Sequence, residues 1–276
     1  MIQSIRFFRS NDPLYVYTYD DNGIAIEKEW GGKCTWDDFK ILSKERPIFS
    51  PPSPKTNFIN IPGGNGALDI SESLTGFPTY NDREGSWTFR VMNDYKPWHE
   101  RYSEIMAFIH GQELTAILFD DQQWMYKGRF WVSDWKSADT WSEITISYRV
   151  NPHKWSIFTP GEAWLWDPFN FDNGVIKDKK FNGINISGIL TQTFGSSNGD
   201  FFGNAPIVPT FYWVPTDRVS HLSVDFRNEF LGLNLTATVR PGLNVMHDLV
   251  IFGNDTYTMT FRGNGVLDID YQAGRL

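Results

Sequence analysis

Residues 51–89, PPSPKTNFINIPGGNGALDISESLTGFPTYNDREGSWTF, are the stretch that decides the fold. Prolines at 51, 52 and 54 fix φ and bias the residues before them away from helix, so the chain enters this stretch extended. A strand is predicted next, because Phe58, Ile59 and Ile61 are aromatic or β-branched. The run Pro62–Gly66 then ends that strand with residues that tolerate positive φ.

The second half of the stretch is predicted to return to the protein interior. Ala67, Leu68 and Ile70 are expected to re-enter the core. After turn-like residues 81–85, Trp87 and Phe89 alternate as a further strand. No residue here carries recognisable chemistry, so we interpret the stretch as a scaffold whose prolines and glycines constrain the backbone path.

The flanking residues predict more β-structure and a single helix. Residues 5–30 alternate as a strand pair, with a hairpin turn at Asp20–Gly23. A helix is predicted over 97–110, since Pro97 suits a first turn, Gly111 suits a stop and the apolar residues fall at helical spacing. A hairpin over 114–132 and a closing strand over 141–150 follow.

Asn151–Trp155 interrupts the closing strand and is the predicted domain boundary, which gives domains 1–152 and 153–276. The second domain is predicted to lack helices and to contain about seven short strands, which suggests a β-sandwich. These strands are 184–189, 207–213, 221–226, 233–239, 249–252, 256–261 and 266–271. The predicted fold class is therefore mainly β, with a β-sandwich-like first domain that carries one α-helix and a β-hairpin.

Composition excludes several classes of protein. The 276 residues suffice for two cores, and 41% hydrophobic content excludes a disordered chain. The formal net charge of −8 has no clustered basic counterpart, so we expect no specific nucleic-acid binding. Cys34 is the only cysteine, which excludes an internal disulfide. The sequence shows neither a signal peptide nor an 18-residue apolar run, so we do not expect membrane insertion. We expect the protein to assemble in a reducing cytoplasm.

The decisive stretch resembles the siphophage distal tail protein family. The resemblance rests on an Ile-Pro-Gly turn, a Leu-Asp pair, a Thr-Gly pair and a Tyr and an Arg before an aromatic strand, with further matches in a hairpin downstream. The corresponding residues are Ile61, Pro62, Gly63, Gly66, Leu68, Asp69, Thr75, Gly76, Tyr80, Arg83, Tyr126, Gly128 and Arg129. One departure is that the Asn-Arg pair expected after Tyr80 is split into Asn81-Asp82-Arg83.

This resemblance implies a structural component of a phage or prophage tail tip. The first domain would form a homohexameric ring that joins the tail tube protein to the tail hub. A galectin-like second domain would hold receptor-binding or baseplate proteins. The implied location is the virion, after assembly in the bacterial host cytoplasm. The acidic composition further suggests a neutral-to-acidic channel through which DNA passes without specific binding.

A carbohydrate-binding module or host-surface adhesin is the alternative, because tryptophans on a sandwich surface can stack on sugars. A galectin-type site requires particular polar residues after its His and Trp. The residues that follow His221, His247 and Trp213 here do not fit that pattern. Catalysis is not expected: Gly195–Gly199 matches a nucleophile elbow in letters, but lies in a polar stretch. The five histidines never occur at metal-ligand spacing, so no cofactor or metal is predicted.

Overall fold

A computed structural model describes residues 3–19, 25–92, 96–138, 141–157, 169–170, 175–176, 181–195, 203–217, 220–228, 232–252 and 256–276. Contacts divide the chain into two compact units, Met1–Lys154 and Trp155–Leu276. Each unit has its own hydrophobic core. The predicted turn Asp20–Gly23, and residues 196–199 of the nucleophile-elbow match, lie outside the described residues.

The first unit is built on one large antiparallel sheet. Its main strands follow the order β4-β1-β9-β10-β11-β8-β5. Their bounds are β1 Ile5–Phe8, β4 Lys33–Cys34, β5 Ile41–Ser43, β8 Arg83–Val91, β9 Gln112–Leu118, β10 Trp124–Ser137 and β11 Ser142–Val150. The predicted hairpin over 114–132 and the closing strand over 141–150 are therefore confirmed, as β9–β10 and β11.

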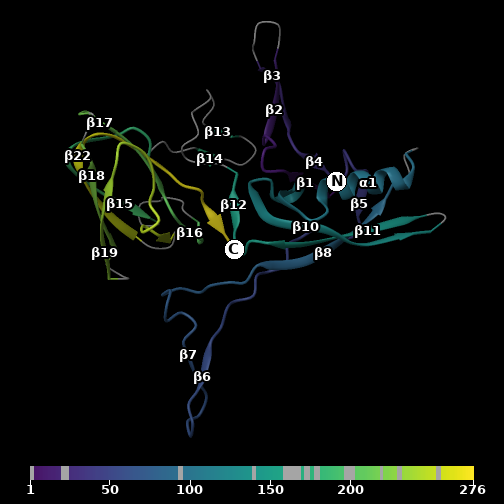
Figure 1. Cartoon of the computed structure of the whole chain (residues 1–276), viewed down its shortest axis with the longest axis horizontal. Helices are drawn as coiled ribbons and strands as arrows, with labels where there is room; N and C mark the ends of the chain where they lie inside the picture. The colour runs from purple at the N-terminus through teal and green to yellow at the C-terminus, as the bar shows by residue number, and fades with distance from the viewer. Residues whose placement is uncertain are drawn as a thin grey trace. The chain divides into compact units, whose positions relative to one another are not determined.

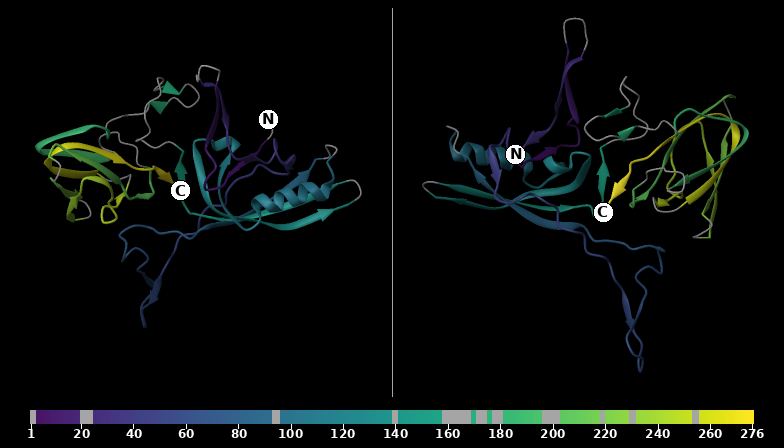
Figure 2. Two further views of the ribbon diagram at one scale, coloured as in Figure 1. Left: turned by 45° about the horizontal axis from the view of Figure 1, so that its top comes forward. Right: turned by 180° about the vertical axis from the view of Figure 1, so that it is seen from behind.

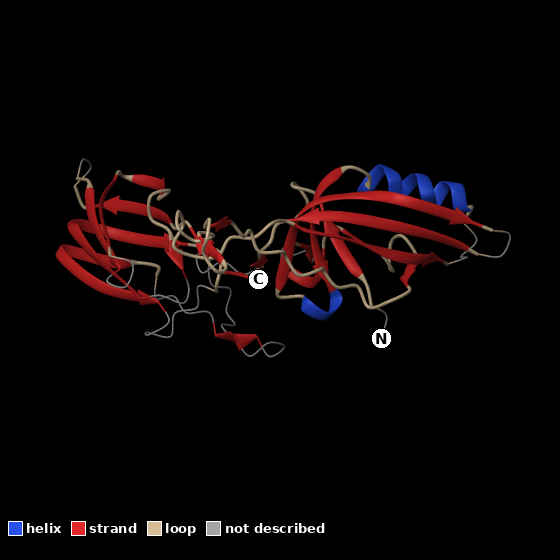
Figure 3. Cartoon of the chain, turned by 90° about the horizontal axis from the view of Figure 1, so that it is seen from below, coloured by secondary structure: helices blue, strands red, loops and turns tan. Residues whose placement is uncertain are grey.

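The predicted helix is confirmed as α1, Trp98–Ile109, which lies along one face of this sheet (Figure 3). Pro97 occupies the position before the first helical residue, and Gly111 follows the helix with a φ of 71°. Ile105 and Ile109 are fully buried against β9 and β10. A short 3₁₀ turn, η1 Phe119–Asp121, connects β9 to β10.

Aromatic rings fill the core between the helix and the sheet. Phe49 stacks on Tyr126 with ring centroids 3.9 Å apart, and Trp87 lies 4.4 Å from Tyr148. Phe7 meets Phe130 edge to face at 5.1 Å. Such pairs add about 0.5–1.5 kcal/mol each beyond their buried area. Part of the 16% aromatic content of the chain is thus used to build this core.

Two hairpins leave the body of the first unit in different directions (Figures 1 and 2). One pairs β2, Tyr15–Tyr19, with β3, Ala25–Trp30. The other pairs β6, Phe58–Asn60, with β7, Ala67–Asp69. The predicted strand pair over 5–30 is corrected in one respect: Ile5 and Phe7 belong to β1 in the large sheet, and only 15–30 forms the hairpin.

The expectation that Ala67, Leu68 and Ile70 re-enter the core is wrong. Every residue of β6 and β7 is exposed, and Ile70 is only half-buried. Apolar residues at strand spacing predict a buried face only when a second layer covers it, and none of the described residues of this unit forms such a layer over the β6–β7 hairpin.

The second unit is also β-structured. Its largest sheet has the order β19-β18-β22-β17-β20, with β15 paired to β22. The strands are β12 Lys154–Ser156 at the boundary, β13 Phe169–Asn170, β14 Val175–Ile176, β15 Ile184–Gly195, β16 Pro206–Ile207, β17 Thr210–Pro215, β18 Leu222–Asn228, β19 Leu233–Val239, β20 Gly242–Val245, β21 Ile251–Phe252, β22 Thr256–Asp270 and β23 Gly274–Arg275. The mainly-β fold class is confirmed.

Two strands predicted separately, 256–261 and 266–271, form the single strand β22. The glycines between them suggested a turn. At Gly265, a β-carbon would lie 2.4 Å from the Val214 carbonyl oxygen, so glycine permits close backbone approach between β22 and β17. In the described part of the chain, no helix combines the length and apolar character needed to cross a membrane.

Candidate functional site

Residues 51–80, which we call the arm, form a highly exposed feature of the first unit. Phe58 is 56% exposed and Leu74 99%, and Ile59, Ile61 and Leu68 are also exposed. A two-stranded hairpin is marginally stable in water without a surface to pack on. Contiguous exposed apolar residues on a soluble protein commonly mark an interaction surface. The arm therefore has the composition of a segment that binds another surface.

Glycine shapes the arm by conformation. Gly63, Gly66 and Gly76 have φ values of 77°, 83° and 72°, in the left-handed region that other residues enter at a cost of about 1–2 kcal/mol. A β-carbon at any of the three would meet no atom within 4 Å. Pro62 and Thr75 precede two of these turns, and Thr75 donates a 2.7 Å hydrogen bond to the Phe77 carbonyl.

The polar residues of the arm hold its own backbone. Asp69 accepts a 2.9 Å hydrogen bond from the Ser71 N–H and another from the Ser71 hydroxyl. These bonds lower the pKa of Asp69 below its usual range. The Ser71 Oγ in turn accepts a 2.7 Å bond from the Asn57 N–H. Asp69 thus orients Ser71, and Ser71 connects the two sides of the arm through its hydrogen bond with Asn57.

Arg83 anchors the base of the arm in the protein body. Its side chain is buried, with a relative exposure of 6%. The Nε donates a 2.7 Å hydrogen bond to the Pro152 carbonyl, and the Nη1 donates a 3.1 Å bond to the Ser50 carbonyl. Burial lowers the pKa of this guanidinium, although it stays protonated at any physiological pH. One side chain therefore joins both ends of the arm to the end of the first unit.

Tyrosines surround this anchor. The Arg83 guanidinium lies 5.8 Å from the centre of the Tyr126 ring. Burial is the main reason that the pKa of Tyr126 rises to about 12, and the carboxylate of Asp121 adds to the shift. The Tyr148 hydroxyl accepts a 2.8 Å hydrogen bond from the Ser50 N–H. The N–H and the carbonyl of Ser50 are therefore both hydrogen-bonded, the first to Tyr148 and the second to Arg83, which fixes the base of the arm.

His153 completes the base of the arm. Its ring meets Tyr80 edge to face at 6.1 Å, and Tyr80 forms an isolated bridge with Pro54. Burial, and then the positive charge of Arg83, lower the pKa of His153. The imidazole is therefore neutral near neutral pH.

The family-motif residues separate into three groups. Nine lie on the arm, with Tyr80 at its base, Arg83 follows the arm as its anchor, and three lie on β10. Of the last three, Tyr126 reaches Arg83, Arg129 donates a hydrogen bond to the Gly111 carbonyl, and Gly128 lets β10 approach β11. A β-carbon on Gly128 would lie 2.2 Å from the Arg149 carbonyl oxygen. The contacts among the described residues do not join Asp69 to Arg83.

Sequence reasoning missed Phe49, Ser50, Pro152 and His153 as parts of this base. The two carbonyls that bind Arg83 have no side-chain signal in the sequence. Within the described residues, no group of three His, Cys, Asp or Glu side chains is placed to hold a metal. Trp213, the tryptophan considered for sugar stacking in the second unit, is fully buried and donates its Nε1–H to the Ser220 carbonyl.

Comparisons with known proteins give an informative likeness. No known family model matches the chain, and no curated protein does. This chain is similar to the SPP1 Dit protein, whose crystal structure is known. That protein is described as a paradigm of the hub adsorption apparatus in phages infecting Gram-positive bacteria. The TM-score is 0.51 at 11% identity, covering 87% of this chain and 96% of that one.

A second solved structure, of infectious bursal disease virus strain Gx, covers 99% of this chain and 66% of that one at 12% identity. Its TM-score of 0.18 is too low to support any argument. The similarity to the SPP1 protein shows that the chain has a Dit-like fold.

Proposed function

We propose that this protein is a structural component of a phage or prophage tail tip that assembles as a homohexameric ring between the tail tube and the hub. The observation that carries the proposal is the Dit-like fold, which extends over 87% of this chain and 96% of the SPP1 protein. Likeness at 11% identity concerns the fold, so the function depends on what this chain's own surfaces can do.

The arm supports an assembly role. Its apolar side chains face solvent in the single chain, while its base is fixed by buried hydrogen bonds from Arg83. A fixed base with an apolar extension suits a contact between neighbouring copies, because binding buries the exposed apolar side chains and gives the hairpin a surface to pack on. A head-to-tail contact of this kind closes into a ring when the rotation between copies permits it.

In this proposal the tail tube protein and the hub bind the two faces of the ring. The second unit holds receptor-binding or baseplate proteins. The protein resides at the virion tail tip after assembly in the host cytoplasm. Its formal charge of −8 favours passage of DNA through the ring without retention, because phosphates are not attracted to an acidic wall. A strongly positive channel in the assembled ring would contradict that last point.

Light scattering and negative-stain microscopy of the full chain test the ring. We expect a particle of six times the 31.9 kDa of one chain and a ring in projection. The variant Phe58→Ser with Leu68→Ser should shift the protein towards monomer while retaining its circular dichroism spectrum, since both side chains are exposed in the single chain.

Leu243→Ser is the matched control, because Leu243 is an exposed leucine on β20 in the second unit. It should leave the ring intact. A protein that remains monomeric at all concentrations, or a ring unaffected by the paired arm substitutions, would overturn the role assigned to the arm.

A further inference from the structure

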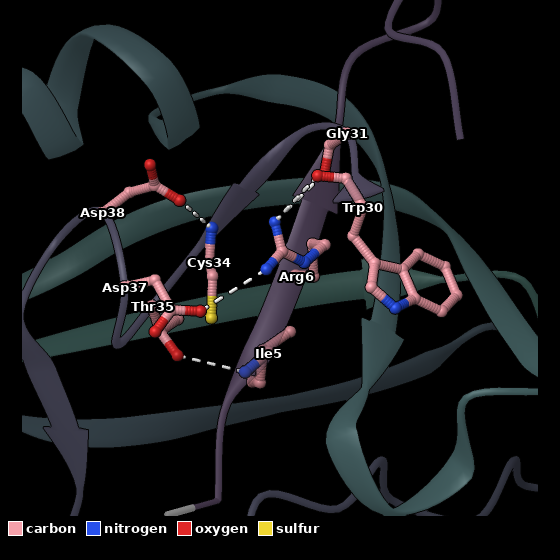
Figure 4. Close-up of polar contacts among 8 residues, drawn as sticks. All are labelled: Ile5, Arg6, Trp30, Gly31, Cys34, Thr35, Asp37 and Asp38. Carbon is pink, nitrogen blue, oxygen red and sulfur yellow. Dashed lines mark hydrogen bonds and ion pairs between the residues drawn. The ribbon is translucent and has the colours of Figure 1, made fainter. Parts of the chain in front are cut away.

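A pocket of about 410 Å³ opens beside β1 in the first unit, away from the arm. This volume lies within the range of about 300–1,000 Å³ typical of small-molecule sites. We call it the Arg6 pocket; Figure 4 shows the polar contacts around Arg6. The lining residues that matter here are Arg6, Trp30, Trp36, Asp37, Ile117 and Gln122.

Strand register builds the floor of the Arg6 pocket. Arg6 of β1 pairs with Ile117 of β9 on one side and with Cys34 of β4 on the other. The three side chains therefore form one row across three strands. Ile117 is only 3% exposed although it lines the pocket. The floor is accordingly apolar, with the aliphatic stem of Arg6 at its centre.

Two indoles form aromatic walls, and their neighbours hold them in place. Trp30 packs against Tyr15 at 4.7 Å and against Phe8 at 6.5 Å. Trp36 carries the Lys40 ammonium 5.8 Å from its ring centre. Trp30, which is packed against two rings, is a preorganised surface, so a ligand that stacks on it does not have to order it first.

The charge of the pocket is balanced. The Arg6 Nη1 donates to the Gly31 carbonyl at 3.1 Å, and the Nη2 lies 3.4 Å from Asp37 Oδ2 (Figure 4). Asp37 is 65% exposed at the rim. A carboxylate already accompanies the guanidinium in the pocket lining, and the Lys40 ammonium over Trp36 lies outside that lining. A phosphate or carboxylate ligand would therefore have to compete with Asp37 for Arg6. Guanidinium N–H groups and carboxylate oxygens remain suitable partners for neutral hydroxyl groups.

From these features we propose that the Arg6 pocket binds a neutral saccharide. The C–H face of a sugar ring stacks on Trp36 or Trp30, and an N-acetyl or methylene group covers the apolar floor at Ile117. Sugar hydroxyls bond to Asp37, Arg6 and the Gln122 amide. Combined aromatic platforms and planar polar groups favour a sugar over a wholly apolar peptide, which would leave the Arg6–Asp37 pair desolvated. The inference is independent of ring assembly.

Saturation-transfer NMR and tryptophan fluorescence on the full chain test this proposal. The probes are the tetrasaccharides of β-1,4-linked N-acetylglucosamine, β-1,4-linked glucose and α-1,4-linked glucose, with inorganic phosphate as the anionic probe. We expect at least one tetrasaccharide to bind with a micromolar-to-millimolar dissociation constant and phosphate not to bind. Trp36→Ala should weaken that binding at least about tenfold, through loss of the stacking surface.

Trp141→Ala is the matched control, because Trp141 is an exposed indole away from the pocket lining, and it should bind normally. Asp37→Asn, at an exposed position, should weaken binding about threefold or more and decides the question if Trp36→Ala fails to fold. Absence of binding to all three sugars, tighter binding of phosphate, or unchanged affinity in the folded variants would overturn the proposal.

Discussion

The Nε of Arg83 donates a 2.7 Å hydrogen bond to the backbone carbonyl of Pro152, 69 residues further along the chain. The same guanidinium binds the Ser50 carbonyl. The position of the arm is thus coupled to the segment where the first unit ends. Hydrogen bonds from a buried charged group are worth more than those between neutral groups, so this contact dominates the base of the arm.

Replacing Arg83 by Met should lower the free energy of unfolding of the first unit by about 3 kcal/mol, because two carbonyl oxygens lose a charged donor. Urea unfolding monitored by tryptophan fluorescence measures the change, and amide exchange should accelerate near Ser50. Arg90→Met is the matched control on the same strand. Its side chain is exposed, so the change should stay within about 0.5 kcal/mol. Equal effects of the two variants would contradict the anchoring role.

Acidification should destabilise the protein through His153. Its pKa is lowered in the folded state by burial and by Arg83, so the unfolded chain binds a proton first as pH falls below the ordinary value of 6.5. The stabilising contribution is present above that value and is lost as pH falls towards the lower folded pKa. His153→Gln should reduce the difference between unfolding midpoints measured at about pH 7.5 and about pH 5.5. An unchanged difference would contradict this account.

Tyr126 should make stability sensitive to alkali. Its folded pKa of about 12 exceeds the ordinary value of 10.0, so the phenol of the unfolded chain ionises first. Stability should therefore fall as pH rises from about 10 towards 12. Tyr126→Phe should reduce that loss, whereas Tyr212→Phe, at an exposed site in the second unit, should not. Unfolding midpoints across this range give the comparison.

Two glycines should respond differently to alanine. In Gly128→Ala the new β-carbon would lie 2.2 Å from one backbone atom and 2.5 Å from another, and neither can move without separating β10 from β11. We expect a loss of about 3 kcal/mol, at the upper end for overpacking. In Gly76→Ala the new β-carbon meets no atom within 4 Å, and only the φ of 72° opposes the change. We expect this strain to lower the stability of the arm alone, by about 1–2 kcal/mol. Thermal unfolding of the core should therefore distinguish the two variants.

Local signals explain what was predictable. The bounds of α1 follow from Pro97, which fixes its own φ, and from Gly111, which readily adopts the positive φ of 71° that follows the helix. Alternating apolar residues and turn residues predicted the strands β9, β10 and β11 from the sequence. Of the candidate site, the sequence identified the glycines of 62–66 by their tolerance of positive φ, and Arg83 and Tyr126 only by family resemblance, without the contacts that give them a role.

The amino-acid sequence by itself determined that the chain is mainly β with one helix, because periodicity and backbone restriction act over a few residues. Only the tertiary structure decided that the arm's apolar residues face solvent, that Arg83 reaches Pro152 and that Arg6 lies between Ile117 and Cys34. The first depends on whether another layer covers the arm, the second on a contact between residues 69 positions apart, and the third on strand register between distant segments. Register is set by how the whole sheet packs on its core, which no single segment encodes.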